Sequence, residues 1–237
     1  MDSRDLTRYA LVVVDAQKGF DDPAWGTRNN PACDDNIAAL VERWHAGRRP
    51  VVHVRHDSTN PASPLHPDSP GNQLKDYLST PPDLLVVKSV NSSFHGSPDL
   101  HAWLVAQDLD GIVVCGITTN HCCETTARVG GNLGHDVLFA IDATHTFDRT
   151  GPDGKTMTAD ELARATATNL HGEFATVVTT REVLGADAAK VMVAEAIRSS
   201  RIFLTWPEAR LMRFRVIFTL RLVLDKSKDM NSRNYAV

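Results

Sequence analysis

Short runs of apolar, mostly β-branched residues recur along this chain and alternate with segments of helical periodicity. Such runs are typical of strands that are buried on both faces, and their alternation with helices indicates an α/β fold with a parallel sheet. The predicted strands cover residues 10–15, 50–56, 83–88, 111–117, 136–142 and 175–180.

Two segments between these runs carry clear helix signals. Residues 31–46 predict a helix that Asn30 caps and Pro31 opens. Thr158 followed by Glu161 matches a capping box at the start of a second helix. The apolar face of the first helix is formed by residues at helical spacing, namely Ile37, Leu40, Val41 and Trp44.

The charge of the chain is divided unevenly. Residues 1–189 hold 15 basic and 25 acidic side chains, whereas residues 190–237 hold 10 basic and 4 acidic ones. We therefore expect one domain over 1–189 and a basic C-terminal extension of unknown structure over 190–237. Residues 201–226 are apolar but interrupted by arginines, which leaves an amphipathic helix or an added strand pair open. Docking of the extension onto the acidic domain is favoured over nucleic-acid or membrane binding.

The four cysteines of the chain form no CxxC pair and no zinc-finger spacing. Residues 1–9 are charged and lack the apolar core of a signal peptide, and no apolar stretch is long enough to span a membrane. We therefore expect a cytoplasmic protein in a reducing compartment, with thiols free for chemistry.

Three reactive side chains occupy equivalent places in the predicted sheet. Asp15 and Lys88 each close a strand, and Cys122 begins the helix that follows the strand 111–117. Ligands bind outside the carboxyl ends of strands in an open parallel sheet. We therefore expect the three side chains to meet at one cleft.

These residue types suit nucleophilic catalysis. A helix N-terminus and a nearby ammonium favour the thiolate of Cys122, and a carboxylate can accept its proton. Backbone amides in the turn before Cys122 can hold an oxyanion. Taken from spacing alone, simpler readings stay open: Asp15 as a turn cap, Lys88 reaching into water, and Cys122 as a small core residue.

The segment VCGITTNHCCETTAR (114–128) resembles the nucleophile motif of the isochorismatase-like cysteine hydrolases. ALVVVDAQKGF (10–20) and VVKSVNSSFHGSPDL (86–100) are similar to the segments that carry the family's catalytic aspartate and lysine. The resemblance thus implies Cys122 as nucleophile, with Asp15 and Lys88 as its catalytic partners. FAIDATHTFDR and LHGEFATVVTT match later blocks of the family, so the likeness covers about residues 8–185 and not the extension.

The resemblance also implies a fold and an assembly. The family fold is a three-layer, Rossmann-like arrangement in which a six-stranded parallel sheet is flanked by helices. It includes a cis peptide bond, here Ile117–Thr118, that would aim the amides of Thr118 and Cys122 at the oxyanion. Members are usually oligomeric, so we expect a homo-oligomer, at least a dimer.

One departure bears on metals and cofactors. Nicotinamidases of this superfamily carry a metal-binding Asp-x-His-x-x-His segment after the second strand. Here VHVRHDSTNPASPLHP (52–67) has no His at either required spacing after Asp57. We therefore expect no catalytic metal and no cofactor, although His53, His56 and His66 keep the chemistry of metal ligands.

The predicted substrate-binding residues follow the strand ends or the nucleophile turn: Gln17, Phe20, Trp25, Phe94, Asn120 and His121. His145 and Phe147 are further candidates for the rim. The long loop 57–82 is rich in Pro, Ser, Asn and Gly, and loops of this length are usually functional.

The intact set of acid, amine and thiol indicates hydrolysis of an amide, lactam or carbamoyl C–N bond in a small molecule through a thioester. Two alternatives within the fold are an isochorismate-type vinyl ether hydrolase and, as a specific amidase, a streptothricin-type lactam hydrolase. A non-catalytic binding module is disfavoured by the complete set. The sequence contains no code for the substrate itself.

Overall fold

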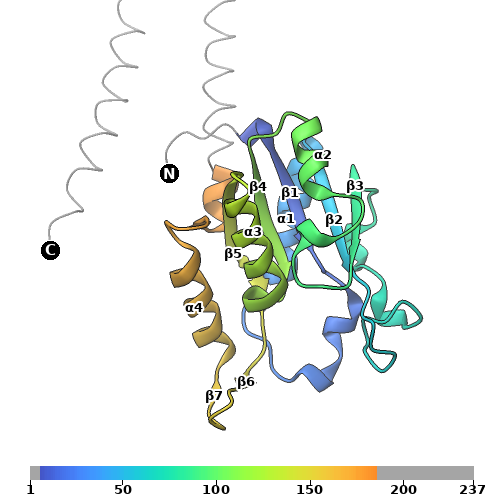
Figure 1. Cartoon of the computed structure of the whole chain (residues 1–237), viewed down its shortest axis with the longest axis vertical. Coiled ribbons are helices and arrows are strands. Elements are labelled where there is room, and N and C mark those ends of the chain that lie inside the picture. The colour runs from blue at the N-terminus through green and yellow to red at the C-terminus, as the bar shows by residue number, and fades with distance from the viewer. Residues whose placement is uncertain (1–5, 186–237) are drawn as a thin grey trace, which may run out of the picture. The chain divides into compact units, whose positions relative to one another are not determined.

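The computed structural model describes residues 6–185 of the chain. Expectations for the extension 190–237, including a helix or strand pair over 201–226, lie outside these residues. Within them, a parallel sheet of six strands has the order β3-β2-β1-β4-β5-β8, with helices on both faces (Figure 1). The expected fold class is confirmed.

The strands lie where the apolar runs predict them, with ends shifted by one or two residues in most cases. The exception is β5, which continues past the predicted end at residue 142 as far as His145. Its pairing with β4 changes register between Val114 and Gly116, so β5 holds extra residues here before its last residues pair with β4 again. The strands are β1 (Tyr9–Val14), β2 (Val51–His56), β3 (Leu84–Lys88), β4 (Gly111–Ile117), β5 (Asp136–His145) and β8 (Thr176–Val178), with a small ribbon of β6 (Arg149–Thr150) and β7 (Thr156–Met157).

The helices cover the two faces of the sheet unequally. Helix α1 (Cys33–Ala46) packs on one face, and α2 (Leu100–Ala106), α3 (Glu124–Asn132) and α4 (Ala159–Leu170) pack on the other. None of the helices in the described part of the chain has the length and apolar character needed to cross a bilayer.

The cap predicted for the first helix is wrong, and the cap predicted for α4 is confirmed. Asn30 does not cap α1, because its amide donates instead to the carbonyls of Asp142 and Thr144 at 2.7 and 2.6 Å. Asn30 therefore ties the loop before α1 to the end of β5. Thr158 and Glu161 form the complete capping box of α4.

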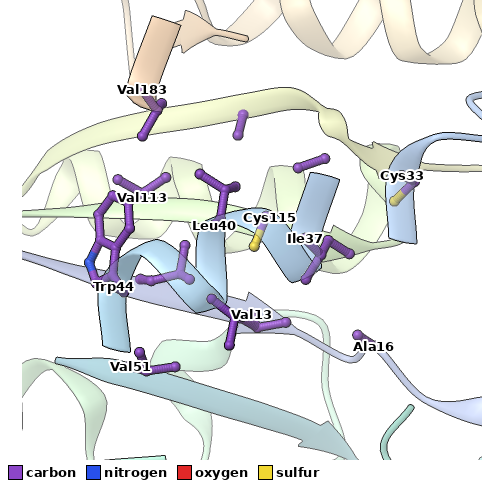
Figure 2. Close-up of a cluster of buried hydrophobic side chains, with 14 of the residues drawn as sticks. Val13, Ala16, Cys33, Ile37, Leu40, Trp44, Val51, Val113, Cys115 and Val183 are labelled. Carbon is purple, nitrogen blue, oxygen red and sulfur yellow. The ribbon is translucent and has the colours of Figure 1, made fainter. Parts of the chain in front are cut away.

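Alternate side chains of the central strands supply the two halves of the core. Val13 and Val113 point toward α1, where they meet the buried face formed by Ile37, Leu40 and Trp44 (Figure 2). The neighbouring strand residues point the other way, toward α2, α3 and α4. Burial on both faces accounts for the unbroken apolar runs in the sequence.

The order in which the chain adds strands to the sheet reverses between β1 and β4, because β2 and β3 lie on one side of β1 and β4, β5 and β8 lie on the other. The carboxyl ends of strands on either side of such a point form a crevice in open α/β sheets. Gly116 lets the two strands approach here, because its φ is 125° and a Cβ would overlap the carbonyl of Val14. The fold therefore opens a crevice where Asp15 and the Cys122 turn emerge.

Candidate active site

An acid and an amine from different strand ends form a buried ion pair. Asp15 directly follows β1, and Lys88 is the last residue of β3. Both side chains are fully buried, and Lys88 Nζ lies 2.6 Å from Asp15 Oδ2. The backbone of Asp15 has a φ of 47°, a left-handed conformation that costs most side chains about 1–2 kcal/mol. This conformation turns the chain sharply at the crevice.

The thiol of Cys122 comes from a π-helical turn, Thr119–Cys123, that joins β4 to α3. The turn follows a cis peptide bond between Ile117 and Thr118, as the resemblance implies. Cys122 is 7% exposed, and its sulfur contacts Asp15, Lys88 and, at 3.8 Å, Asn91 Oδ1. The acid, the amine and the thiol are therefore neighbours, although they are far apart in the sequence.

The electrostatics of the thiol differ from the expectation of a resting thiolate. Burial raises the pKa of Cys122 well above its ordinary value, the Asp15 carboxylate raises it further, and Lys88 opposes both. Burial is the largest single effect and lowers the pKa of Lys88, but Asp15 and Cys122 together outweigh it, so the pKa lies above its ordinary value. The resting state therefore holds a neutral thiol beside a charged pair, and Asp15 is placed to accept the thiol proton.

A cavity of about 160 Å³ opens onto this group. Its volume is below the ~300–1,000 Å³ typical of pockets for drug-sized ligands, so it suits a small substrate. Its lining combines aromatic, polar and charged side chains: Asp15, Phe20, Trp25, His56, Leu65, Asn91, Thr118, His121, Cys122, Thr146, Phe147, Asp148 and Arg149.

Three of the six predicted substrate-binding residues line the cavity, namely Phe20, Trp25 and His121, and so does the rim candidate Phe147. Phe20, Trp25 and Phe147 form an aromatic wall, in which the Trp25 ring is 5.4 Å from Phe20 and 5.7 Å from Phe147. His121 lies in the cavity lining, with Nδ1 3.3 Å from Thr118 Oγ1. Burial and the charge of Arg149 lower the pKa of His121, so this ring is neutral near pH 7.

Three other predicted contacts do not line the cavity. Gln17 is fully buried and bonds to the backbone of His56 and to the carbonyl of Asn72. Phe94 stacks on His135 at 5.7 Å. Gln17 and Phe94 therefore contact other parts of the fold and not the cavity. The third, Asn120, accepts a 2.5 Å hydrogen bond from Thr146, which does line the cavity.

The sequence reasoning missed several residues of the lining. His56 is the last residue of β2 and pairs with Lys88 in the register of the sheet, so the strand-end rule that selected Lys88 also selects His56. Asn91 lies three residues after Lys88. The others come from the loop 57–82 and from the segment after β5, which the sequence indicated as segments without singling out these residues: Leu65, Thr146, Asp148 and Arg149. His145 does not reach the rim and is fully buried.

The cavity also contains donor atoms of the kind that bind metals. Asp15, His56 and Cys122 offer an oxygen, a nitrogen and a sulfur within 4.8 Å of one another, a set whose chemistry suits zinc. The Lys88 ammonium lies 2.6 Å from Asp15 Oδ2 and 3.2 Å from His56 Nδ1 and already supplies positive charge to this group. The expectation of a metal-free reaction stays a prediction.

The two other histidines considered as metal ligands lie elsewhere. His53 is buried within β2, and neither ring nitrogen has a hydrogen-bond partner in the described part of the chain. His66 lies on the loop 57–82, with Nδ1 accepting from the Asp68 amide, and it is absent from the cavity lining. Neither joins the group around Lys88.

Comparison with known proteins places this site in a family. Residues 9–182 match the isochorismatase domain. The chain belongs to the isochorismatase family of hydrolases. The isochorismatase family protein YrdC of Bacillus subtilis, itself uncharacterised, is 36% identical over 178 residues, which are 75% of this chain and 95% of YrdC.

Family relatives with more specific names are also similar. Nicotinamidase 3 of Arabidopsis thaliana is 30% identical over 71% of this chain and 83% of its own length. Streptothricin hydrolase of Streptomyces noursei is 30% identical over 59% of this chain and 50% of its own length. A solved structure, a cysteine hydrolase from Pseudomonas syringae, is 28% identical with a TM-score of 0.71, covering 80% of this chain and 96% of the other.

Proposed function

We propose that this family member hydrolyses a C–N bond of a small amide, lactam or carbamoyl compound, with Cys122 as the nucleophile. The observation that carries the proposal is the buried Asp15–Lys88 pair, 2.6 Å apart, in contact with the Cys122 sulfur beside a cavity that Asp15 and Cys122 line. A vinyl ether hydrolysis needs no thiol, whereas a covalent amidase needs a nucleophile, such as this thiol, together with a base and a stabilising charge.

The first half of the proposed reaction forms a thioester. Asp15 accepts the proton of the Cys122 thiol while Lys88 stabilises the thiolate. The sulfur attacks the substrate carbonyl carbon, and amides of the turn, at Thr118 and Cys122, hold the oxyanion. The C–N bond then breaks, and Asp15 returns the proton to the leaving nitrogen, so that ammonia or an amine departs.

The second half releases the acid. Asp15 removes a proton from a water molecule, and the resulting hydroxide attacks the thioester carbonyl. The C–S bond breaks, the carboxylic acid leaves, and the proton held by Asp15 regenerates the thiol. One carboxylate therefore serves both halves, which fits its contacts with both Lys88 and Cys122.

The cavity and the relatives support a small substrate with a C–N bond. A cavity of about 160 Å³ accommodates only a small group at the reacting carbon. Two of the relatives are named for the hydrolysis of nicotinamide and of streptothricin. Among these classes we propose simple amides and carbamoyl compounds first, because a bulky substrate would have to extend past the aromatic wall.

Replacement of Cys122 by Ala tests the proposal, and replacement of the neighbouring Cys123 serves as the control. A panel of amides, lactams and carbamoyl compounds is assayed for ammonia or amine release with the wild type, Cys122→Ala and Cys123→Val. Cys122→Ala should abolish turnover while the unfolding midpoint stays close to wild type. Cys123 is fully buried, and its replacement by a residue of similar volume should retain activity.

Acid quenching during turnover gives a second readout. Mass spectrometry should find the acyl group of the substrate on the peptide that contains Cys122. Full activity in Cys122→Ala would refute the covalent route. The route would also be refuted if the only detectable reaction were the release of pyruvate from isochorismate and Cys122→Ala still catalysed it.

A further inference from the structure

The Lys88 ammonium has one contact for which the proposed reaction gives no role. An ammonium carries three N–H donors. In this site they face Asp15 Oδ2 at 2.6 Å, the Cys122 sulfur, and His56 Nδ1 at 3.2 Å. The first two contacts serve the reaction directly. The third joins the ends of β2 and β3, where His56 and Lys88 are register partners.

The backbone of His56 is held from behind by two buried side-chain amides. Gln17 accepts from the His56 amide at 2.8 Å and donates to its carbonyl at 3.1 Å. Asn72, from the loop 57–82, donates to the same carbonyl at 3.2 Å. These bonds fix the backbone from which the imidazole extends toward Lys88. They also give Gln17, a predicted substrate contact, a structural role.

The contact with Lys88 determines the tautomer of His56. An ammonium cannot accept a hydrogen bond, so Nδ1 must accept and the ring proton must lie on Nε2. The ring lines the cavity, and Nε2 has no hydrogen-bond partner among residues 6–185. His56 is therefore held as a neutral acceptor on one side and faces the cavity on the other.

We propose that His56 is a positioning residue of this site: its neutral imidazole accepts an N–H of Lys88 and so holds the ammonium between Asp15 and the Cys122 sulfur. The proposal rests on the proposed function of that site. Protonation of His56 would remove the acceptor and place a second cation against Lys88. The arrangement therefore exists only while His56 is neutral.

The charges around His56 give the direction of its pH dependence. Lys88 faces it from β3, Asp15 from the end of β1, Cys122 from the turn before α3, and Asp57 follows it in the chain. Burial and then Lys88 lower the pKa of His56, Asp15 and Asp57 raise it, and the result lies below the ordinary value of about 6.5. The ring is thus neutral at pH 7. Activity should fall as the pH is lowered through the pKa of His56, which lies below about 6.5.

Three substitutions separate the acceptor from the rest of the ring. His56→Asn places an amide oxygen near the position of Nδ1, His56→Gln reaches the position of Nε2, and His56→Ala leaves no acceptor. His66→Asn is the matched control, because His66 lies on the adjacent loop outside the cavity lining. Steady-state kinetics are measured from pH 5 to 9, together with the rate at which iodoacetamide alkylates Cys122.

Removing one hydrogen bond to a charged group should lower kcat by about tenfold to a hundredfold in His56→Ala and His56→Gln, with a smaller change in KM. His56→Asn should recover most of kcat at pH 7 and lose the acid limb that the ring contributes. The control should match the wild type. Wild-type kcat and an unchanged acid limb in all three variants, or equal losses in Asn and Ala, would overturn the proposal.

The rate of Cys122 alkylation tests the role of His56 independently of whether the proposed function is correct. If the wild type cleaves no C–N compound, the proposed function fails, yet the alkylation rates of Cys122 still compare the His56 variants. Loss of alkylation at pH 7 in His56→Ala, restored in His56→Asn, supports the positioning role alone. Should His56→Ala fail to fold, judged by its unfolding transition, the Asn and Gln variants carry the comparison.

Discussion

At the scale of single residues, the site is organised around one carboxylate with two opposing effects. Asp15 raises the pKa of the Cys122 thiol, and it is also the group placed to accept the thiol proton. Burial and this carboxylate together keep the thiol neutral, which differs from a permanent thiolate pair. In the proposed reaction, proton transfer to Asp15 accompanies attack on the substrate carbonyl.

This double role predicts that Asp15→Asn separates reactivity from catalysis. Without the carboxylate the pKa of Cys122 falls, so iodoacetamide should alkylate Cys122 faster at pH 8 than in the wild type. Turnover should nevertheless drop by about 10²–10⁴, the usual contribution of a general acid–base. Asp76→Asn, an exposed acid outside the cavity, is the control and should change neither rate. Slower alkylation together with lost turnover would contradict the proposed charge balance.

At the scale of elements, the strands were predictable, and the loop side chains that line the cavity were predictable only in part. Asp15 and Lys88 were found from the sequence because strand ends meet at one sheet edge in any parallel sheet. Phe94 was misplaced because the sequence does not show which way a residue points after a strand ends. Here its ring stacks on His135 beside α3.

Among the strands, β5 differs most from its predicted bounds, and this difference has a consequence for the cavity. Alternation of apolar residues ends near Asp142, but hydrogen bonds to Gly116 and Ile117 of β4 carry the strand on to His145. The segment that follows, Thr146 to Arg149, is thereby lifted into the cavity lining. Pairing between distant strands sets this extension, and a pattern read along one segment does not contain it.

Helix α4 offers a stability prediction at the same scale. The Thr158 side chain accepts from the Glu161 amide at 3.2 Å, and Glu161 accepts from the Thr158 amide at 2.8 Å. Thr158→Ala should lower the free energy of unfolding by about 1 kcal/mol, the usual value of an N-cap. Denaturant unfolding measures the loss, and Thr158→Ser should restore most of it. Equal stability of the Ala variant and the wild type would show that the cap contributes nothing.

At the scale of the whole molecule, the reactive residues and the family match lie in the same part of the chain. Every residue of the cavity lining falls between Asp15 and Arg149, and the family match ends at residue 182. The described core closes with Val183, which is fully buried among the residues that pack against α1 (Figure 2). The domain boundary predicted near residue 189 lies after Val183, so a chain that ends there keeps this buried residue.

We therefore predict that a chain ending at residue 189 keeps the kcat and KM of the 237-residue chain, although its net charge changes from −4 to −10. A second chain ending at residue 179 is the matched comparison, because it also loses Val183. Removing a fully buried valine and its neighbours exposes apolar core, so this chain should unfold at lower denaturant concentration. Light scattering on the 189-residue and 237-residue chains tests the predicted homo-oligomer and shows whether the extension alters it. Loss of activity in the 189-residue chain would mean that residues 190–237 contribute to the working enzyme, and the two-part division of the chain would then be wrong.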